Sequence, residues 1–181
     1  MYFDGRAHHP KFDDFGGGCT FLADKSNNQN YERTESSMFP WAIKDQLVAG
    51  PRPRIKEKPT SQVARQTVDA WLKKAKINFG IRSIICLLDE RQLRLYAGLD
   101  RDLVSYYRAS GFQVAHIPVR NYKRPALSDR ELEKVWKAYQ RLERPVLIHC
   151  SAGIGRTGKA ASYVKQRLTV GLKRALPPNK Q

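Results

Sequence analysis

The sequence predicts an α/β fold, a three-layer sandwich in which helices flank a mainly parallel central sheet. Short apolar runs that suit strands alternate along the chain with longer segments of helical periodicity, and such alternation is typical of parallel sheets with crossover helices. Two of the apolar runs, 83–88 and 146–149, are nearly continuous, as expected for strands covered on both faces. The 181 residues, 41% of them apolar, are enough for one ordinary domain with its own core.

Three regions are expected along the chain. Residues 1–37 are rich in Gly, Asn, Asp and Ser without a sustained period, so we expect a flexible N-terminal extension there. Residues 38–170 carry the alternating pattern and are expected to form the ordered domain. Residues 171–181 are expected to form a short C-terminal tail, because the segment from residue 169 onward shows little periodicity and contains two consecutive prolines.

The first elements of the domain are a strand and a helix. Residues 46–49 suit a short strand that ends at the Gly-Pro-Arg-Pro segment 50–53. The helix that follows has Thr60 or Ser61 as its expected cap and Gly80 just past its end. Its apolar residues recur at the helical spacing i, i+3, i+4 and i+7, namely Val68, Trp71, Leu72 and Ala75.

Two further strands enclose a second helix. The isoleucine-rich run 83–88 predicts a buried strand, and a helix is expected near 100–109 because Gly111 closes that segment. Residues 112–117 predict the next strand, which Pro118 interrupts.

The last helices and strand are marked most clearly. Ser128 and Glu131 form a capping box. The helix behind it has an apolar stripe made of Leu132, Val135, Trp136 and Tyr139. Residues 146–149 predict a buried strand, and a helix is expected from Thr157 to about Leu168.

The segment 148–158 runs from a strand end through a glycine-containing loop into a helix N-terminus. Such a loop can hold an anion, because successive backbone N–H groups and the helix dipole point toward it. Gly153 and Gly155 supply backbone freedom for the curve, and the Arg156 guanidinium can bind two phosphate oxygens at once. The expected phosphate-binding residues are Ser151, Ala152, Gly153, Ile154, Gly155 and Arg156.

The same loop predicts nucleophilic chemistry at Cys150. Its surroundings favour the thiolate, which can attack phosphorus and form a phosphocysteine intermediate, while Arg156 and the backbone amides hold the other oxygens. Thr157 is placed to offer its hydroxyl to the sulfur and ease departure of the thiolate. His149 is expected to order the loop by hydrogen bonding rather than to act as a base.

The residues HCSAGIGRTG at 149–158 resemble the signature of cysteine-based protein tyrosine phosphatases, and the chain's size resembles their compact dual-specificity branch. The resemblance extends from about Trp41 through Leu168. It implies a phosphatase domain over 38–170 that hydrolyses phosphate monoesters on phosphoproteins, phosphotyrosine among them, without metal or organic cofactor. A phosphoinositide or RNA 5′-triphosphate phosphatase, and a non-catalytic module that binds phosphorylated residues, are the alternatives.

The general acid of that family is an Asp in the spacing Pro-x-x-Asp, and this chain has Asn121 at the corresponding position after Pro118. An amide cannot give a proton to a leaving group, and general acid catalysis is typically worth ~10²–10⁴ in rate. Three interpretations stay open. Another carboxylate, Asp129 first and Asp89 or Glu90 next, replaces the acid; or the substrate has a weakly basic leaving group such as a phosphoanhydride; or the protein is a slow enzyme or a phosphate-binding pseudoenzyme.

The charge of the chain favours anionic partners. The net charge of +16 is concentrated in residues 41–181, which carry +18. Arg120, Lys123 and Arg124 surround Asn121 and are expected to form a cationic rim, with Arg120 and Asn121 contacting substrate. This rim favours a polyanionic substrate. Nucleic acid is not expected as a partner, because no basic stripe interleaved with aromatic residues is present. Oligomeric state is left open.

Three scattered cysteines, Cys19, Cys86 and Cys150, are too few for a disulfide framework, and no Cys/His cluster suggests zinc. The chain shows neither an export signal nor a run of about 18 apolar residues, so no membrane span and a cytoplasmic location are expected. Some members of the family protect the nucleophile with a disulfide from a position near Cys86. A buried cysteine in the core is the commoner alternative.

Overall fold

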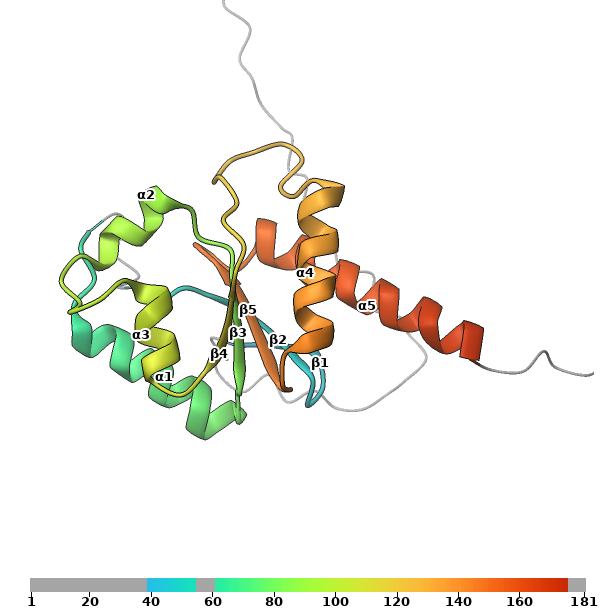
Figure 1. The fold of residues 1–181 in the computed structure, drawn as a ribbon, viewed down its shortest axis with the longest axis horizontal. Coiled ribbons are helices and arrows are strands. Elements are labelled where there is room, and N and C mark those ends of the chain that lie inside the picture. The colour runs from blue at the N-terminus through green and yellow to red at the C-terminus, as the bar shows by residue number, and fades with distance from the viewer. Residues whose placement is uncertain (1–38, 55–60, 176–181) are drawn as a thin grey trace, which may run out of the picture. The chain divides into compact units, whose positions relative to one another are not determined.

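Figure 1 shows the computed structural model, which describes residues 39–54 and 61–175, with side chains described as far as residue 171. The expected extension over 1–37 and the last residues of the expected tail, 176–181, lie outside the described residues. Strands and helices alternate as predicted. In chain order they are β1 (Trp41–Ile43), β2 (Leu47–Pro51), α1 (Arg65–Phe79), β3 (Ser83–Cys86), α2 (Glu90–Leu93), the 3₁₀ helix η1 (Arg94–Tyr96), α3 (Leu103–Ala109), β4 (Gln113–His116), α4 (Asp129–Arg141), β5 (Val146–Cys150) and α5 (Gly155–Ala175).

The five strands form one sheet in the order β1-β2-β5-β3-β4. Strands β2, β5, β3 and β4 are parallel, and only β1 is antiparallel to its neighbour. The register places Pro51 beside Cys150, and Cys86 beside both His149 and His116. The carboxyl ends of the parallel strands therefore meet at one edge, which is where open α/β sheets bind their ligands.

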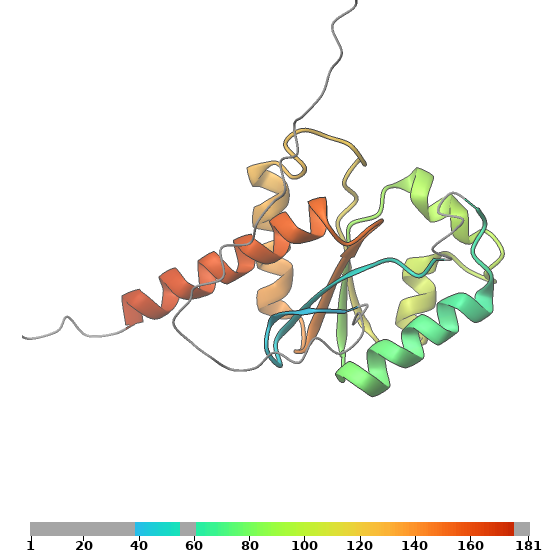
Figure 2. The ribbon, with the colours of Figure 1, turned by 180° about the vertical axis from the view of Figure 1, so that it is seen from behind.

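Helices cover both faces of the sheet, as Figures 1 and 2 show. Helices α1 and α3 pack on one face, where their buried side chains join Val48, Ile84 and Leu147 from the strands. Helices α4 and α5 pack on the other face against side chains that include Ile85 and Ile148. Neighbouring residues of β3 and β5 thus point into opposite cores, and the predicted three-layer α/β sandwich is confirmed.

The beginning of α1 differs from the prediction, whereas its end agrees. The helix begins at Arg65 with Ala64 as its N-cap, which makes no side-chain cap bond, so Ser61 is not the cap; Thr60 lies outside the described residues. Backbone geometry and the buried stripe therefore set this boundary, rather than a polar cap. Gly80 ends the helix in the left-handed region at φ 61°, and its N–H donates to the carbonyl of Ala75.

Helix α4 begins with the predicted capping box. The Ser128 hydroxyl accepts from the backbone N–H of Glu131, and the Glu131 carboxylate accepts from the backbone N–H of Ser128. Its Tyr139 side chain is fully buried. Trp136 is half-buried and stacks on Tyr139, with 6.0 Å between the two ring centroids.

Helix α5 begins at Gly155 and runs to Ala175, beyond the expected end near Leu168. None of the helices in the described ranges is long and apolar enough to cross a membrane.

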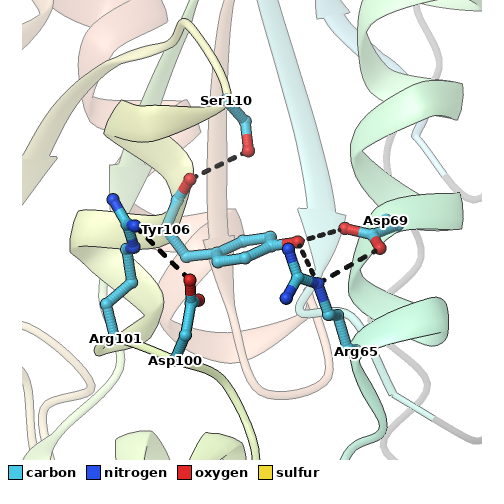
Figure 3. A network of polar contacts seen from close by, with 6 residues as sticks. All are labelled: Arg65, Asp69, Asp100, Arg101, Tyr106 and Ser110. Carbon is cyan, nitrogen blue, oxygen red and sulfur yellow. Dashed lines mark hydrogen bonds and ion pairs between the residues drawn. The ribbon is translucent and has the colours of Figure 1, made fainter.

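A polar network on the surface ties α1 to α3 (Figure 3). The Tyr106 hydroxyl donates to Asp69 Oδ1 at 2.5 Å and accepts from Arg65 Nε at 3.1 Å. Donation to Asp69 raises the pKa of Tyr106. The Tyr106 carbonyl accepts from the Ser110 hydroxyl at 2.9 Å, just past the end of α3. The network holds the two helices of this layer together.

Candidate active site

Residues 151–154 connect β5 to α5 at the edge where the parallel strands end. Cys150 is the last residue of β5 and is only 2% exposed. It opens onto a cavity of about 280 Å³ whose walls come from this loop, the start of α5 and the loop between β4 and α4. The lining residues are Asn121, Tyr122, Lys123, Ala126, Cys150, Ser151, Ala152, Gly155 and Arg156.

Gly153 is the glycine that this loop requires. Its φ is +80°, and a Cβ there would lie 2.6 Å from the carbonyl carbon of Gly50 and 2.6 Å from the nitrogen of Pro51. The loop therefore rests directly on the end of β2, at a distance that only glycine allows. Gly155 differs from the expectation: it has no positive φ, and no atom lies within 4 Å of its Cβ position, so its backbone does not need glycine. Ile154 is 77% exposed and does not line the cavity.

Arg52 contacts the loop through both its backbone and its side chain, a role that the sequence did not reveal. Its backbone N–H donates to the Cys150 carbonyl at 2.9 Å, and its Nε lies 3.4 Å from the Ser151 hydroxyl. Its Nη1 donates to the Tyr96 hydroxyl at 3.0 Å, and Tyr96 in turn donates to the Pro53 carbonyl at 2.6 Å. The side chain of Arg52 is 2% exposed, so this cation is a buried part of the loop's support.

His149 is fully buried behind the loop. Its Nδ1 lies 3.4 Å from the Cys150 carbonyl oxygen. Its ring makes edge contacts with the rings of Trp71 and Tyr107, with centroid separations of 5.5 Å and 5.7 Å. Burial lowers the pKa of His149 to about 3, since an imidazolium loses its hydration there. A neutral ring in this position suits the expected ordering role, and it cannot serve as a cationic partner of the thiolate.

Arg156 is held by four acceptors, all of them uncharged. Its Nη1 donates to the carbonyls of Leu87 at 2.9 Å and Val119 at 2.6 Å. Its Nη2 donates to Gln92 Oε1 at 2.9 Å and to Asn121 Oδ1 at 3.2 Å. The guanidinium is thus oriented without an ion pair in the described part of the chain, and its four contacts use all of its Nη hydrogens, which leaves Nε–H as the remaining donor. Gln92 was not singled out from the sequence; the structure places it in α2, a four-residue helix too short to show a periodic signal.

Asn121 is positioned by its backbone as well as its side chain. Its N–H donates to Asp89 Oδ2 at 3.1 Å, while Asp89 Oδ1 accepts from the Gln92 N–H at 3.0 Å as the N-cap of α2. Asp89 therefore joins α2 to the loop after β4, the two segments that carry the amide partners of Arg156. Its own side chain is not on the cavity wall.

The other candidate acids lie outside the cavity wall too. Asp129 is the first residue of α4 and is exposed. Glu90 and Arg120 line a separate hollow of about 270 Å³, together with Asp89, Arg91 and Pro118. The structure thus brings Cys150, Arg156 and Asn121 to one cavity, whose wall does not include Arg120 or Asp129.

The remaining residues of interest are Lys123, Thr157 and Cys86. The Lys123 ammonium lines the cavity and forms an ion pair with Glu131 at 2.9 Å. The Thr157 hydroxyl is fully buried and has no hydrogen-bond partner among the described residues. Cys86 and Cys150 are both free thiols. Burial raises the pKa of Cys86 to about 12, which makes it an unreactive core residue.

A family model, Tc-R-P, described as a DSP-PTPase phosphatase of polymorphic toxin systems, matches residues 64–167, more than half of the chain. The chain belongs to this family. It is accordingly a phosphatase of the dual-specificity and tyrosine phosphatase type. The matched range includes the whole of the loop described above. A comparison with curated protein sequences found no match.

Three solved structures similar to this chain are the following. PTPMT1 in complex with PI(5)P is 12% identical over 74% of this chain and 75% of its own, with a TM-score of 0.49. Kinase associated phosphatase with its catalytic cysteine replaced by serine is 21% identical over 73% and 67%, with a TM-score of 0.49. The core catalytic domain of the PP-IP phosphatase SIW14 from S. cerevisiae, in complex with citrate, is 14% identical over 80% and 79%, with a TM-score of 0.42.

Proposed function

We propose that this phosphatase hydrolyses its substrate through a phosphocysteine intermediate at Cys150. One observation carries the proposal: the Cys150 thiol and the Arg156 guanidinium line the same cavity, at the junction of β5 with the N-terminus of α5. A phosphoryl group in that cavity is within reach of a nucleophile, an oriented cation and a helix N-terminus. Cys150 is the nucleophile, Arg156 binds the phosphoryl group through Nε–H, the N–H that its four contacts leave available, and backbone N–H groups of 151–155 hold the other oxygens.

The reaction has two steps. The Cys150 thiolate attacks phosphorus, an S–P bond forms, and the P–O bond to the leaving group breaks with its electron pair going to that oxygen. Water then attacks the phosphocysteine, the P–S bond breaks and the thiolate is restored, while the proton of the water passes to the released phosphate. Thr157 donates its buried hydroxyl to the departing sulfur in this second step, which gives that otherwise unpartnered group a role.

The substrate is anionic. The sequence favours a phosphoprotein, with phosphoinositides and RNA 5′-triphosphate ends as alternatives, and the cationic surroundings of the cavity suit any of these polyanions. Lys123 lies on the wall itself, where its ammonium is paired with Glu131. Arg120 and Arg124 are exposed on the same loop, where they raise the local concentration of anions.

The experiment is steady-state turnover of an activated aryl phosphate, such as 4-nitrophenyl phosphate, by the full chain. Cys150→Ser should abolish turnover, and acid quenching of the parent should trap a phosphocysteine on the peptide that contains residue 150. Cys86→Ala is the matched control, because that thiol is buried away from the cavity, and it should retain turnover. If Cys150→Ser retains turnover, Cys150 is not the nucleophile and the proposal is wrong. If the parent has no turnover while still binding tungstate, the chain is a phosphate-binding module and the proposal is wrong as well.

A further inference from the structure

We infer that the bond cleaved at this site is a phosphoanhydride, in which the leaving group is itself a phosphate. The inference rests on the proposed function of Cys150 and deepens it by naming the substrate class. It follows from what the cavity wall offers to a leaving group, from how the neighbouring carboxylates are engaged, and from the job that Asn121 performs.

The cavity wall carries no carboxylic acid and no histidine among the residues in the described ranges. Its polar side chains are an amide, a phenol, an ammonium, a hydroxyl, the thiol and the guanidinium. The phenol of Tyr122 is 95% exposed, so it stands in solvent at the mouth of the cavity. The ammonium of Lys123 is bound to Glu131. The wall therefore offers the leaving oxygen no buried, oriented acid.

The nearby carboxylates of Asp89 and Glu131 accept hydrogen bonds from other protein groups. Asp89 accepts two backbone N–H groups, from Gln92 and Asn121, so both of its oxygens are occupied. Partial burial would favour the protonated form of Glu131, but the bonds from Lys123 and Ser128 outweigh it and lower the pKa of Glu131 to about 2. A carboxylate that is ionised at every working pH holds no proton to give.

Asn121 stands where the acid is expected and does different work. Its Oδ1 accepts from Arg156 Nη2 at 3.2 Å, so the side chain turns toward the phosphate-binding cation. An amide in this place positions Arg156 without neutralising it. The substitution is therefore compatible with a functioning site, provided that the substrate needs no protonation as it leaves.

A phosphoanhydride meets that condition. The oxygen expelled from an organic diphosphate belongs to a phosphate monoester, whose second pKa is about 6, whereas tyrosine phenol has a pKa of about 10. The P–O bond breaks with its electron pair on the bridging oxygen, and the phosphate monoester departs as a dianion that requires no proton at pH 7. A phenolate, and still more an alkoxide, is too basic to leave readily in this way.

The charges around the cavity suit such a substrate. A phosphoanhydride brings at least one further phosphate beside the one that is transferred. Arg156 faces the first, and Lys123 lies on the same wall, where the second phosphate would take the place of Glu131 as the partner of its ammonium. The excess of positive charge on residues 41–181 acts in the same direction. Nucleoside di- and triphosphates, inositol pyrophosphates and inorganic pyrophosphate share this chemistry.

The test compares kcat/KM for two aryl phosphates and for phosphoanhydrides. For phenyl phosphate, kcat/KM should be ~10²–10⁴-fold below that for 4-nitrophenyl phosphate, the range that a missing general acid costs. At least one of a nucleoside 5′-triphosphate, an inositol pyrophosphate and inorganic pyrophosphate should be hydrolysed within tenfold of the activated ester. The relative rates on the three anhydrides identify the source of the substrate.

Each other outcome is decisive. Similar rates on both aryl phosphates would mean that an acid acts in the site, and the inference would fall; Tyr122→Phe and Asp129→Asn would then identify the donor. Hydrolysis of the activated ester without any anhydride turnover would also overturn it. Loss of all turnover is a different failure, because it removes the proposed function. Tyr106→Phe, in the network of Figure 3, is the control that should leave every ratio unchanged.

Discussion

Replacing Asn121 by Asp places a carboxylate against the Arg156 guanidinium. In the present structure the Asn121 Oδ1 to Arg156 Nη2 distance is 3.2 Å, and the other three acceptors of Arg156 are neutral. Two opposite charges about 4 Å apart attract by ~4 kcal/mol at an effective dielectric constant of 20 and by ~1 kcal/mol in water. A phosphate must compete with that attraction, so Asn121→Asp should weaken oxyanion binding at least tenfold.

The assay is calorimetric titration of tungstate into the Cys150→Ser background, with and without Asn121→Asp. Asn121→Ala is the matched control: it removes one hydrogen bond without adding charge, which costs about 0.5–1.5 kcal/mol and should change the affinity by tenfold or less. If Asn121→Asp binds tungstate as tightly as Asn121 does, the contact with Arg156 does not form in solution. A tenfold gain in phenyl phosphate turnover at unchanged affinity would refute the reasoning in the same way.

Three further predictions concern the loop and its surroundings. Gly153→Ala should destabilise the protein by more than about 1 kcal/mol in urea unfolding and abolish turnover, because its Cβ would collide with the end of β2, whereas Gly158→Ala, with open space around it inside α5, should be neutral or stabilising. Because the pKa of His149 is about 3 in the native state and 6.5 is its ordinary value, the unfolded chain binds the extra proton between these values. The free energy of unfolding should therefore fall as the pH drops from about 7 toward 3, by up to ~1.4 kcal/mol per pH unit, and His149→Asn should flatten that slope; an unchanged slope would show that His149 is not the responsible group. Tyr106→Phe should cost ~0.5–1.5 kcal/mol of stability, since it unties Asp69 and Arg65, yet leave kcat/KM on an aryl phosphate unchanged.

The parts of the fold that depend on local pattern could be predicted from the sequence. The buried run around Ile84 and Ile85, the capping box before α4 and Gly80 at the end of α1 are each signalled by a few neighbouring residues, and all three are present. Two boundaries were wrong for a common reason. The start of α1 at Arg65 and the length of α5 depend on tertiary packing and backbone continuity, which leave no polar cap or clear period to detect.

The site also has a part that could be predicted from local sequence and a part that could not. The loop that joins β5 to α5 is contiguous in sequence, so its residue types and spacing identify it. Arg156 contacts Gln92, which lies 64 positions earlier in the chain, and Asn121, which lies 35 positions earlier. No pattern around either residue indicates its contact with Arg156. The same holds for Arg52, 99 positions from Ser151, whose burial beneath the loop depends on where β2 lies in the sheet.

The docking of Gly153 on β2 also bears on where a working fragment of this protein can begin. Sequence similarity to the family starts at residue 64, after β2 has ended. A fragment cut there would keep the whole HCSAGIGRTG segment and still lose the strand against which the loop rests. It would also expose the long edge of β5 to unwanted strand pairing and aggregation. The smallest soluble, active piece must therefore reach back at least through β2, some 17 residues before the similarity begins.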